Sequence, residues 1–247
     1  MIRIVPLILS AFLLLLPQES RRRPIYPAAG VTWTLVQHPS NYTCSWSTGL
    51  TTTTCTVATT ATTAGNLLII MGAVFVTHSG VPTSPTYTSA NGDTFTHCPN
   101  SHADIAGTVT RQTIDCYYVL SAAGAATSLN MIINPHTHAG DMSVEVFEVH
   151  RSTGTAVFDT DNNTTNASCT SCNGPALTLT GTDFVAVSGS FEDVPTAINS
   201  PYTNPTDLDN HAVFGGFGGA LNQSSYTTSI FTQTSAGKVA LASTAFK

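Results

Sequence analysis

The chain is poor in charged residues. Only 9% of its 247 residues are Asp, Glu, Lys or Arg, and from Pro24 onward four basic residues face thirteen acidic ones. A mainly helical protein needs Lys, Glu and Arg on the polar faces of its helices, so the composition argues against a helical fold. An acidic surface repels phosphate groups, which argues against nucleic acid and anionic lipid as partners.

Motifs of the common enzyme classes are also missing. The chain has no Gly-x-Ser-x-Gly elbow of the kind that carries a nucleophilic serine. Glu145 and Glu148 are three positions apart on a predicted strand, so they face opposite sides and cannot form a glycosidase acid/base pair. The glycine-rich segment 214–219 lacks the strand-to-helix setting of a nucleotide loop. We therefore expect a protein that is not an enzyme.

What the chain does have is an apolar start. Arg3 precedes an uncharged apolar run over residues 4–16, which is shorter than the roughly 20 residues that span a bilayer. This pattern predicts a signal peptide over 1–20 and no membrane insertion once it is removed. We expect a secreted protein, extracellular or at a cell surface, with an N-terminal extension over 21–40 that contains a first strand at 31–36.

The six cysteines fall into three close couples. Secretion favours disulfides, and neighbour pairing predicts the bonds Cys44–Cys55, Cys98–Cys116 and Cys169–Cys172 among the fifteen pairings that six cysteines allow. The Cys169-Thr-Ser-Cys172 spacing also matches a redox motif. No βαβ pattern surrounds it, so a structural role is favoured.

Thr and Ser make up about a quarter of the chain, and Thr suits the solvent face of a strand. The pattern predicts an all-β fold: one antiparallel β-sandwich of about ten strands over 41–247. Residues 67–76, apolar throughout, predict a central strand buried on both faces, and Asn91-Gly92 predicts a tight turn. Residues 159–175 are expected to form a loop. Further strands are expected at 107–120, 128–133, 141–150, 176–180, 183–190, 211–217 and 238–246.

Several segments occur in an order that resembles a known family. They are Ala64-Gly-Asn-Leu-Leu-Ile-Ile70, Ser89-Ala-Asn-Gly-Asp-Thr-Phe-Thr96, Cys116-Tyr-Tyr-Val-Leu-Ser-Ala-Ala-Gly124, Val144-Glu-Val-Phe-Glu-Val149 and the closing segment 238–247. Over roughly residues 52–247 the chain resembles a widespread family of secreted bacterial and phage-associated β-sandwich domains. The resemblance implies a jelly-roll-like sandwich on a cell or particle surface, and it transfers no catalytic residues. Gly92-Asp93 stands where the family usually has Gly-Asn, and the cysteines are additional.

Aromatic residues in polar segments are the candidates for ligand binding. Tyr42, Trp46, Tyr202 and Tyr226 are flanked by Asn, Ser and Thr, a setting in which a ring can be exposed and stack on a sugar. The alternative for Trp46 is that it covers the neighbouring disulfide as part of a small core.

Two segments carry candidate metal ligands. Asp159, Asp161 and Asn163 supply oxygen atoms at alternate positions, as a structural calcium site would, although the segment is not an EF-hand and an ordinary polar loop is the alternative. His136 and His138 could bind zinc or copper with a third ligand, or could belong to a loop without metal. The candidate third ligands are His97, His102, His150 and Asp141.

Taken together, the sequence predicts a secreted recognition or adhesion module that binds an extracellular glycan or another cell-surface polymer. Two alternatives are kept. One is a structural surface or fibre subunit that self-assembles, which would present a long strand edge or an apolar patch. The other is a metal-dependent hydrolase built on His136 and His138.

Overall fold

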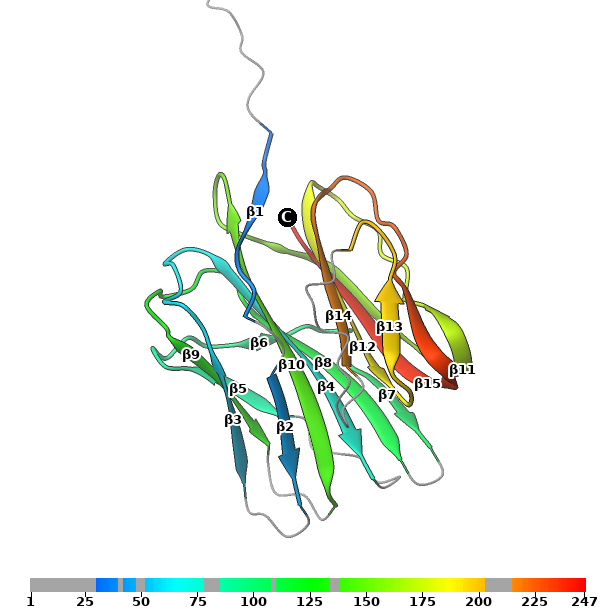
Figure 1. Ribbon diagram of the computed structural model, residues 1–247. Helices are drawn as coiled ribbons and strands as arrows, with labels where there is room; N and C mark the ends of the chain where they lie inside the picture. Colours follow the sequence, from blue (N-terminus) through cyan, green and yellow to red (C-terminus); the bar gives the residue numbers. More distant parts are fainter. Residues whose placement is uncertain are drawn as a thin grey trace, which may run out of the picture. The chain divides into compact units, whose positions relative to one another are not determined.

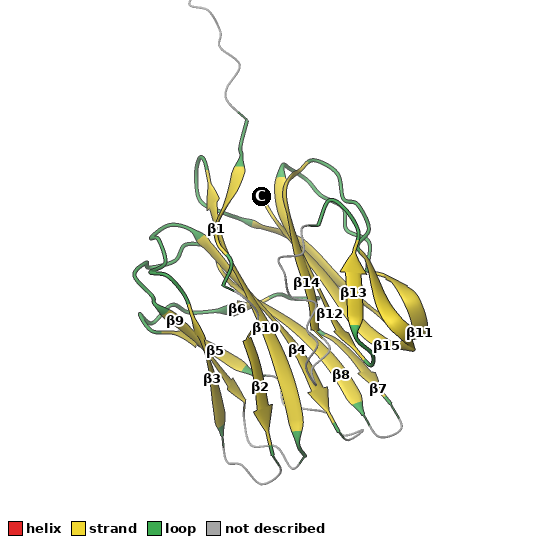
Figure 2. Cartoon of the chain, in the orientation of Figure 1, coloured by secondary structure: helices red, strands yellow, loops and turns green. Residues whose placement is uncertain are grey.

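In the computed structural model, residues 30–39, 42–47, 52–77, 85–107, 110–133, 138–202 and 215–247 are described. These residues form antiparallel β-strands and loops without a helix, so the predicted all-β class is confirmed (Figure 2). One compact unit covers Val31–Lys247. The predicted signal peptide lies outside the described residues. Within them, no helix long and apolar enough for a bilayer is found.

The strands form three sheets, none of which is closed (Figure 1). The seven-stranded sheet has the order β1 (Trp33–Gln37), β10 (Gly140–Arg151), β4 (Leu67–Val76), β8 (Arg111–Val119) and β6 (Thr96–His97), with β2 (Tyr42–Trp46) on β10 and β7 (Ala103–Ala106) on β8. The five-stranded sheet has the order β11 (Phe158–Asn173), β15 (Ile230–Phe246), β12 (Asp183–Phe191) and β14 (Gly215–Gln223), with β13 (Pro195–Ile198) on β15. The small sheet consists of β3 (Thr53–Ala58), β9 (Ser128–Ile133) and β5 (Thr86–Ser89). The described residues thus contain more strands than the ten expected.

The seven-stranded sheet is the middle layer. Alternate residues of β4 point to opposite faces, as in any strand. Leu67, Ile69 and Met71 belong to the core shared with the five-stranded sheet, while Ile70 and Val74 belong to the core shared with the small sheet. The apolar run is therefore buried on both faces, which confirms the prediction for this segment.

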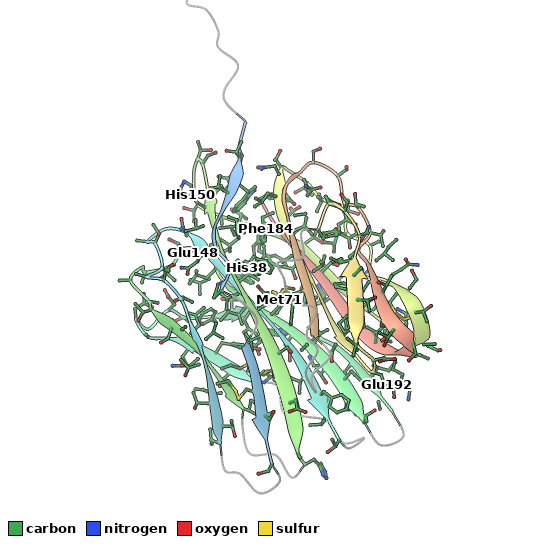
Figure 3. The ribbon with its side chains drawn as sticks, in the orientation of Figure 1. His38, Met71, Glu148, His150, Phe184 and Glu192 are labelled. Atoms are coloured by element: carbon green, nitrogen blue, oxygen red, sulfur yellow. A yellow bond between two sulfur atoms is a disulfide. The ribbon has the colours of Figure 1, made fainter. Side chains whose placement is uncertain are left out.

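Strand β10 follows the same rule with two buried carboxylates. Glu145 pairs with His38, whose ring lies 5.2 Å from that of Phe147. Glu148 accepts hydrogen bonds from the Thr63 N–H at 2.7 Å and the Asn66 amide at 2.6 Å, on the other face (Figure 3). The prediction that these two glutamates do not form an acid/base pair agrees with their separate partners.

All three predicted disulfides are present. Cys44–Cys55 links β2 to β3, and Cys98–Cys116 links the segment after β6 to β8. Cys169–Cys172 closes a short loop near the end of β11. Three disulfides without a free cysteine among the described residues fit an oxidising, extracellular environment.

The prediction of a loop over 159–175 was wrong, because β11 occupies most of it. This strand pairs with β15 from Phe158 to Asn173, with register shifts that absorb extra residues. Asn and Asp favour turns because their side chains bond to nearby backbone, but here those side chains bond to other segments instead. A 17-residue partner strand outweighs the local preference.

Candidate functional site

The aromatic residues predicted to bind ligand are not gathered at one surface. Tyr202 is only 5% exposed and lies in the core on the outer face of the five-stranded sheet, where its hydroxyl bonds to the Thr227 carbonyl. Tyr226 packs against the same core and its hydroxyl donates to the Pro175 carbonyl at 2.7 Å. Polar neighbours in sequence thus surround rings that are buried by tertiary packing, so the ring of Tyr202 is unavailable for stacking on a sugar.

The other two predicted aromatics lie on β2. Tyr42 and Trp46 pair with Val144 and Gly140 of β10 through their backbones. Their side chains lie outside the described part of the structure. Trp46 therefore stays a prediction, both as a ligand-binding residue and as a cover for the Cys44–Cys55 disulfide.

The predicted calcium ligands have protein partners. Asp159 accepts hydrogen bonds from the Thr180 N–H and from the Lys247 ammonium, each at 2.8 Å. Burial opposes its ionisation, but these hydrogen bonds outweigh burial and lower the pKa of Asp159 to about 2.

Asp161 and Asn163 bind a different segment. The Asp161 carboxylate accepts from the Asn100 N–H at 2.6 Å and from the Ser101 hydroxyl at 3.1 Å, and the Asn163 amide donates to the Asn100 carbonyl at 2.7 Å. These side chains fasten the loop after β6 to β11. Among the described residues, no group of three or more His, Cys, Asp or Glu side chains is placed to hold a metal ion.

The histidines considered as zinc ligands lie in separate places. His136 lies outside the described residues, and His138 lies just before the start of β10. His150 Nδ1 is 3.0 Å from Asn66 Oδ1, next to the buried Glu148 (Figure 3). His97 and His102 instead meet at Asp115, a residue that the sequence did not single out.

Asp115 is fully buried on β8 and is shared by two imidazoles. Its Oδ1 lies 3.2 Å from His97 Nε2 and 2.8 Å from His102 Nδ1, and both histidine side chains reach solvent. Burial opposes ionisation of Asp115, but the hydrogen bonds from His102 and His97 outweigh it and lower its pKa. The hydrogen bond to Asp115 raises the pKa of His102, despite its partial burial. The cluster is therefore an Asp115–histidine ion pair at mildly acidic pH.

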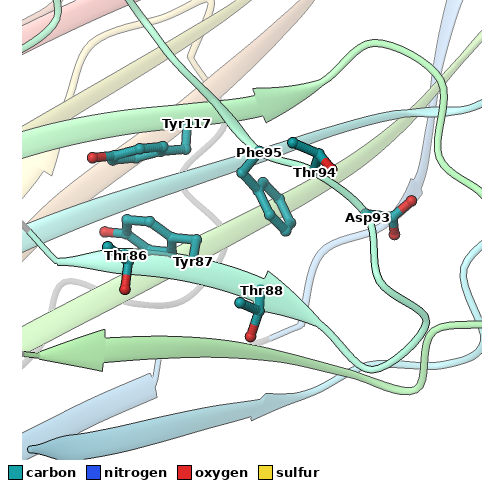
Figure 4. Close-up of a pocket in the computed structure, with 7 residues that line it drawn as sticks. All are labelled: Thr86, Tyr87, Thr88, Asp93, Thr94, Phe95 and Tyr117. Atoms are coloured by element: carbon teal, nitrogen blue, oxygen red, sulfur yellow. The ribbon is translucent and has the colours of Figure 1, made fainter.

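Next to this cluster is a pocket of about 360 Å³, lined by aromatic rings and a polar rim (Figure 4). The rings are Tyr87 of β5, Phe95 and Tyr117 of β8. The ring centroid of Tyr87 lies 4.5 Å from that of Tyr117 and 6.5 Å from that of Phe95. The rim is polar and comprises Thr86, Thr88, Asp93 and Thr94.

Alternation and one turn place these rings. In β5 the residues Thr86 and Thr88 are exposed while Tyr87 is buried, as expected for a strand with one covered face. The predicted turn at Asn91-Gly92 is confirmed, with Gly92 at φ 82°. Asp93 then accepts hydrogen bonds from the Ala123 N–H at 2.8 Å and the Ser89 hydroxyl at 3.0 Å, which fixes the rim.

The inner side of the pocket depends on Gly72 of β4. A methyl group at this position would collide with the Tyr87 hydroxyl, so only glycine leaves room for that ring. Burial, and secondarily the nearby Asp115 carboxylate, raises the pKa of Tyr87 well above its usual value and that of Tyr117 to about 12. Both phenols are protonated at physiological pH. The Tyr117 hydroxyl bonds to the Pro85 carbonyl at 3.3 Å.

The sequence contained a signal for this pocket. Thr86-Tyr-Thr and Thr94-Phe-Thr-His97 both alternate threonine with aromatic residues on either side of the Asn91-Gly92 turn. The sequence alone does not predict that these segments contact Tyr117, which lies twenty residues further along the chain. Neither a family model nor a curated protein matches the chain.

Proposed function

We propose that the protein is a secreted, non-enzymatic recognition module that binds a glycan in the pocket of Tyr87, Phe95 and Tyr117. The observation that carries the proposal is the combination of three aromatic rings with a rim of hydroxyls and one carboxylate. Sugars offer apolar C–H faces to rings and hydroxyl groups to such a rim. Ligand sites in proteins commonly combine an aromatic lining with a few placed polar groups.

The size and stiffness of the pocket also support a small ligand group. A cavity of about 360 Å³ is near the lower end for small-molecule sites, which span roughly 300–1,000 Å³, so it suits the end or one unit of a glycan. The Cys98–Cys116 disulfide and the Asp93 hydrogen bonds hold the rim before ligand arrives. A preorganised site loses less entropy on binding.

Secretion and the jelly-roll-like relation of the two larger sheets are part of the same proposal. The disulfides support an extracellular site of action, and the resemblance supports display on a cell or particle surface. A surface glycan or similar polymer would then be the natural partner.

The test is a broad glycan array, with and without calcium, probed with the wild type, Tyr117→Ala and Tyr226→Ala. We expect selective binding that needs no calcium, is lost in Tyr117→Ala and persists in Tyr226→Ala. A Trp46→Ala arm tests the residue favoured by the sequence. Binding that depends on Trp46 and ignores Tyr117 would move the site to β2, and a blank array from folded protein would remove glycans as the ligand class.

One observation favours the structural-subunit alternative. Strand β11 is 16 residues long and lies at the end of the five-stranded sheet, where backbone groups are open to a further strand. Its outer side chains are polar, and Asn162 bonds to the Ala176 carbonyl at 3.1 Å, so part of this edge is covered. Sedimentation of the purified protein distinguishes this alternative, since a fibre subunit would form large assemblies at micromolar concentration.

A further inference from the structure

We infer that the aromatic pocket selects sugar units that carry a free amino group over N-acetylated and acidic sugars. This inference rests on the proposed function, because it assigns the ligand class of the same pocket. It is argued from the charge of the rim, the arrangement of the rings and the carboxylate behind them.

Asp93 places a negative charge at the rim. Its two oxygens accept hydrogen bonds from neutral donors only, the Ala123 N–H and the Ser89 hydroxyl. Among the described residues, no Lys, Arg or His pairs with Asp93, and none lines the pocket. A carboxylate has about four lone-pair sites, so Asp93 can still accept from an ammonium group. An acidic sugar would meet this carboxylate without a compensating cation.

The three rings line the pocket that such an ammonium group would enter. Cations are attracted to aromatic faces within about 6 Å of the ring centroid. The centroid of Tyr87 lies 4.5 Å from that of Tyr117 and 6.5 Å from that of Phe95. Rings this close pack against one another and form a continuous aromatic wall. An ammonium group against this wall gains a cation–π attraction, whereas an acetamide group gains none.

A second carboxylate, that of Asp115, lies behind the rings. It is two positions before Tyr117 on the same face of β8, opposite Gly72, where the Tyr87 hydroxyl lies. Its carboxylate raises the pKa of both phenols, so its field reaches the pocket wall. His97, whose ring lies 4.8 Å from that of Tyr117, and His102 pair with this carboxylate, and Arg111 is paired with Asp104. The carboxylate at the pocket without a cationic partner among the described residues is therefore that of Asp93.

The experiment compares glucosamine oligomers with N-acetylglucosamine oligomers of equal length by titration calorimetry on the full chain. It is run at about pH 6, where amino groups are protonated. We expect the free-amine oligomer to bind about tenfold more tightly, the sum of a cation–π contact and an exposed ion pair. Asp93→Asn should reduce this preference severalfold, because it removes the charge at the rim.

The matched control is Asp193→Asn. Asp193 is likewise half-buried and accepts the Val194 N–H at 2.8 Å and the Thr234 hydroxyl at 2.7 Å, so it makes comparable hydrogen bonds away from the pocket. This variant should keep the full preference. A second measurement needs no variant: raising the salt from about 0.05 M to 0.5 M should weaken the preference, because salt screens exposed charges.

Two failures are distinguishable. Equal binding of both oligomers, or an unchanged preference in folded Asp93→Asn or at high salt, overturns the amine selectivity and leaves glycan binding standing. If neither oligomer binds and the array is also blank, the proposed function itself is overturned and the selectivity with it.

Discussion

The two faces of β8 differ in a way that separates stability from recognition. Ile114, Cys116 and Tyr118 point toward the five-stranded sheet and lie in the largest core. Asp115 and Tyr117, on the other face, meet histidines and the pocket. Residues adjacent in sequence therefore belong to a packed interior and to a site at the surface. Because side chains alternate along a strand, one face of β8 packs in the core while the other face contributes to the site.

The difference has its origin in the widths of the sheets. The core between the small sheet and the middle layer is built mostly from β3, β5, β9, β4 and β10, with Cys44 of β2 packed against it. On this side of β8, Tyr117 is only partly buried against that core. Tyr87 of β5, the strand at the end of the small sheet, meets Tyr117 there. The pocket forms at that border.

The largest expected effect comes from the packed face. Phe147 is 2% exposed and its ring meets that of Phe184 edge to face at 5.6 Å. Phe147→Ala should lower the free energy of unfolding by about 3–5 kcal/mol through lost burial and the cavity left behind. Tyr117→Ala, on the open face, should cost about 1–2 kcal/mol. Urea unfolding of both variants measures the two losses in the free energy of unfolding. Equal losses would contradict the difference between the packed face and the open face.

The strands predicted most closely are β4, β10 and β12, which are buried on both faces, and β9, which is buried on one. Residues 67–76, 128–133, 141–150 and 183–190 match β4, β9, β10 and β12 to within a residue at each end. By contrast, 176–180 is not a strand. Leu177 and Leu179 alternate as in a strand, but they pack onto the outer core of the five-stranded sheet from a loop. An alternation of apolar and polar residues indicates that one side of a segment is buried. It does not show whether a neighbouring strand forms hydrogen bonds with the backbone of that segment.

The site was less predictable for a related reason. Composition around Tyr202 and Tyr226 is polar, yet both rings pack on a core. The pocket draws Tyr87, Phe95 and Tyr117 from separate strands and loops, and the His97–Asp115–His102 cluster likewise needs β8 beside β6 and the segment that follows it. The local sequence supplies each of these residues, but it does not show which of them come into contact. That depends on the order of the strands in the sheets. The disulfide pairings were predictable because each couple is close in the chain.

The second prediction concerns the disulfide at this border. Cys98–Cys116 closes a loop with a sequence separation of 18, and Cys116 lies on the packed face while His97 and Phe95 precede Cys98. Replacing both cysteines by alanine should cost about 3 kcal/mol by loop entropy. Replacing Cys169 and Cys172, whose separation is 3, should cost about 2 kcal/mol on the same scale.

The two disulfide variants also differ in what they do to recognition. Thermal unfolding measures the stability losses, and glycan titration should show weaker binding only when Cys98 and Cys116 are replaced. If both variants bind alike, the disulfide does not position the rim, and the comparison between the faces would apply to stability only.

The smallest expected effect is a pH dependence on the open face. The pKa of His102 is raised, so its contribution to stability is complete below its unfolded value of about 6.5 and is lost as pH rises through the folded value. The pKa of Asp115 is lowered, so its contribution is present above about 3.9 and is lost as pH falls through the folded value. The pair is most stabilising between these limits.

Because the His102 side chain is 41% exposed, solvent limits this contribution to about 1 kcal/mol or less. Wild type should lose that amount between about pH 6 and pH 9, and His102→Gln should lose less. Urea midpoints across this range measure it. If the wild type and His102→Gln show the same dependence of stability on pH, the Asp115–His102 pair contributes nothing to folding. The effect of Asp115 on the pKa of the two tyrosines would then be its remaining role.

Gly72 has a consequence for how such a domain could change over evolution. At this position, within the apolar run of β4, the Tyr87 hydroxyl occupies the space that a Cβ atom would fill. Alanine there would push the ring outward into the pocket and make it shallower. The depth of the recess can therefore be altered by one substitution in a strand that touches no ligand, while the rim residues, the disulfide and the packed face stay as they are. Relatives with different specificities could arise from the same scaffold in a single mutational step.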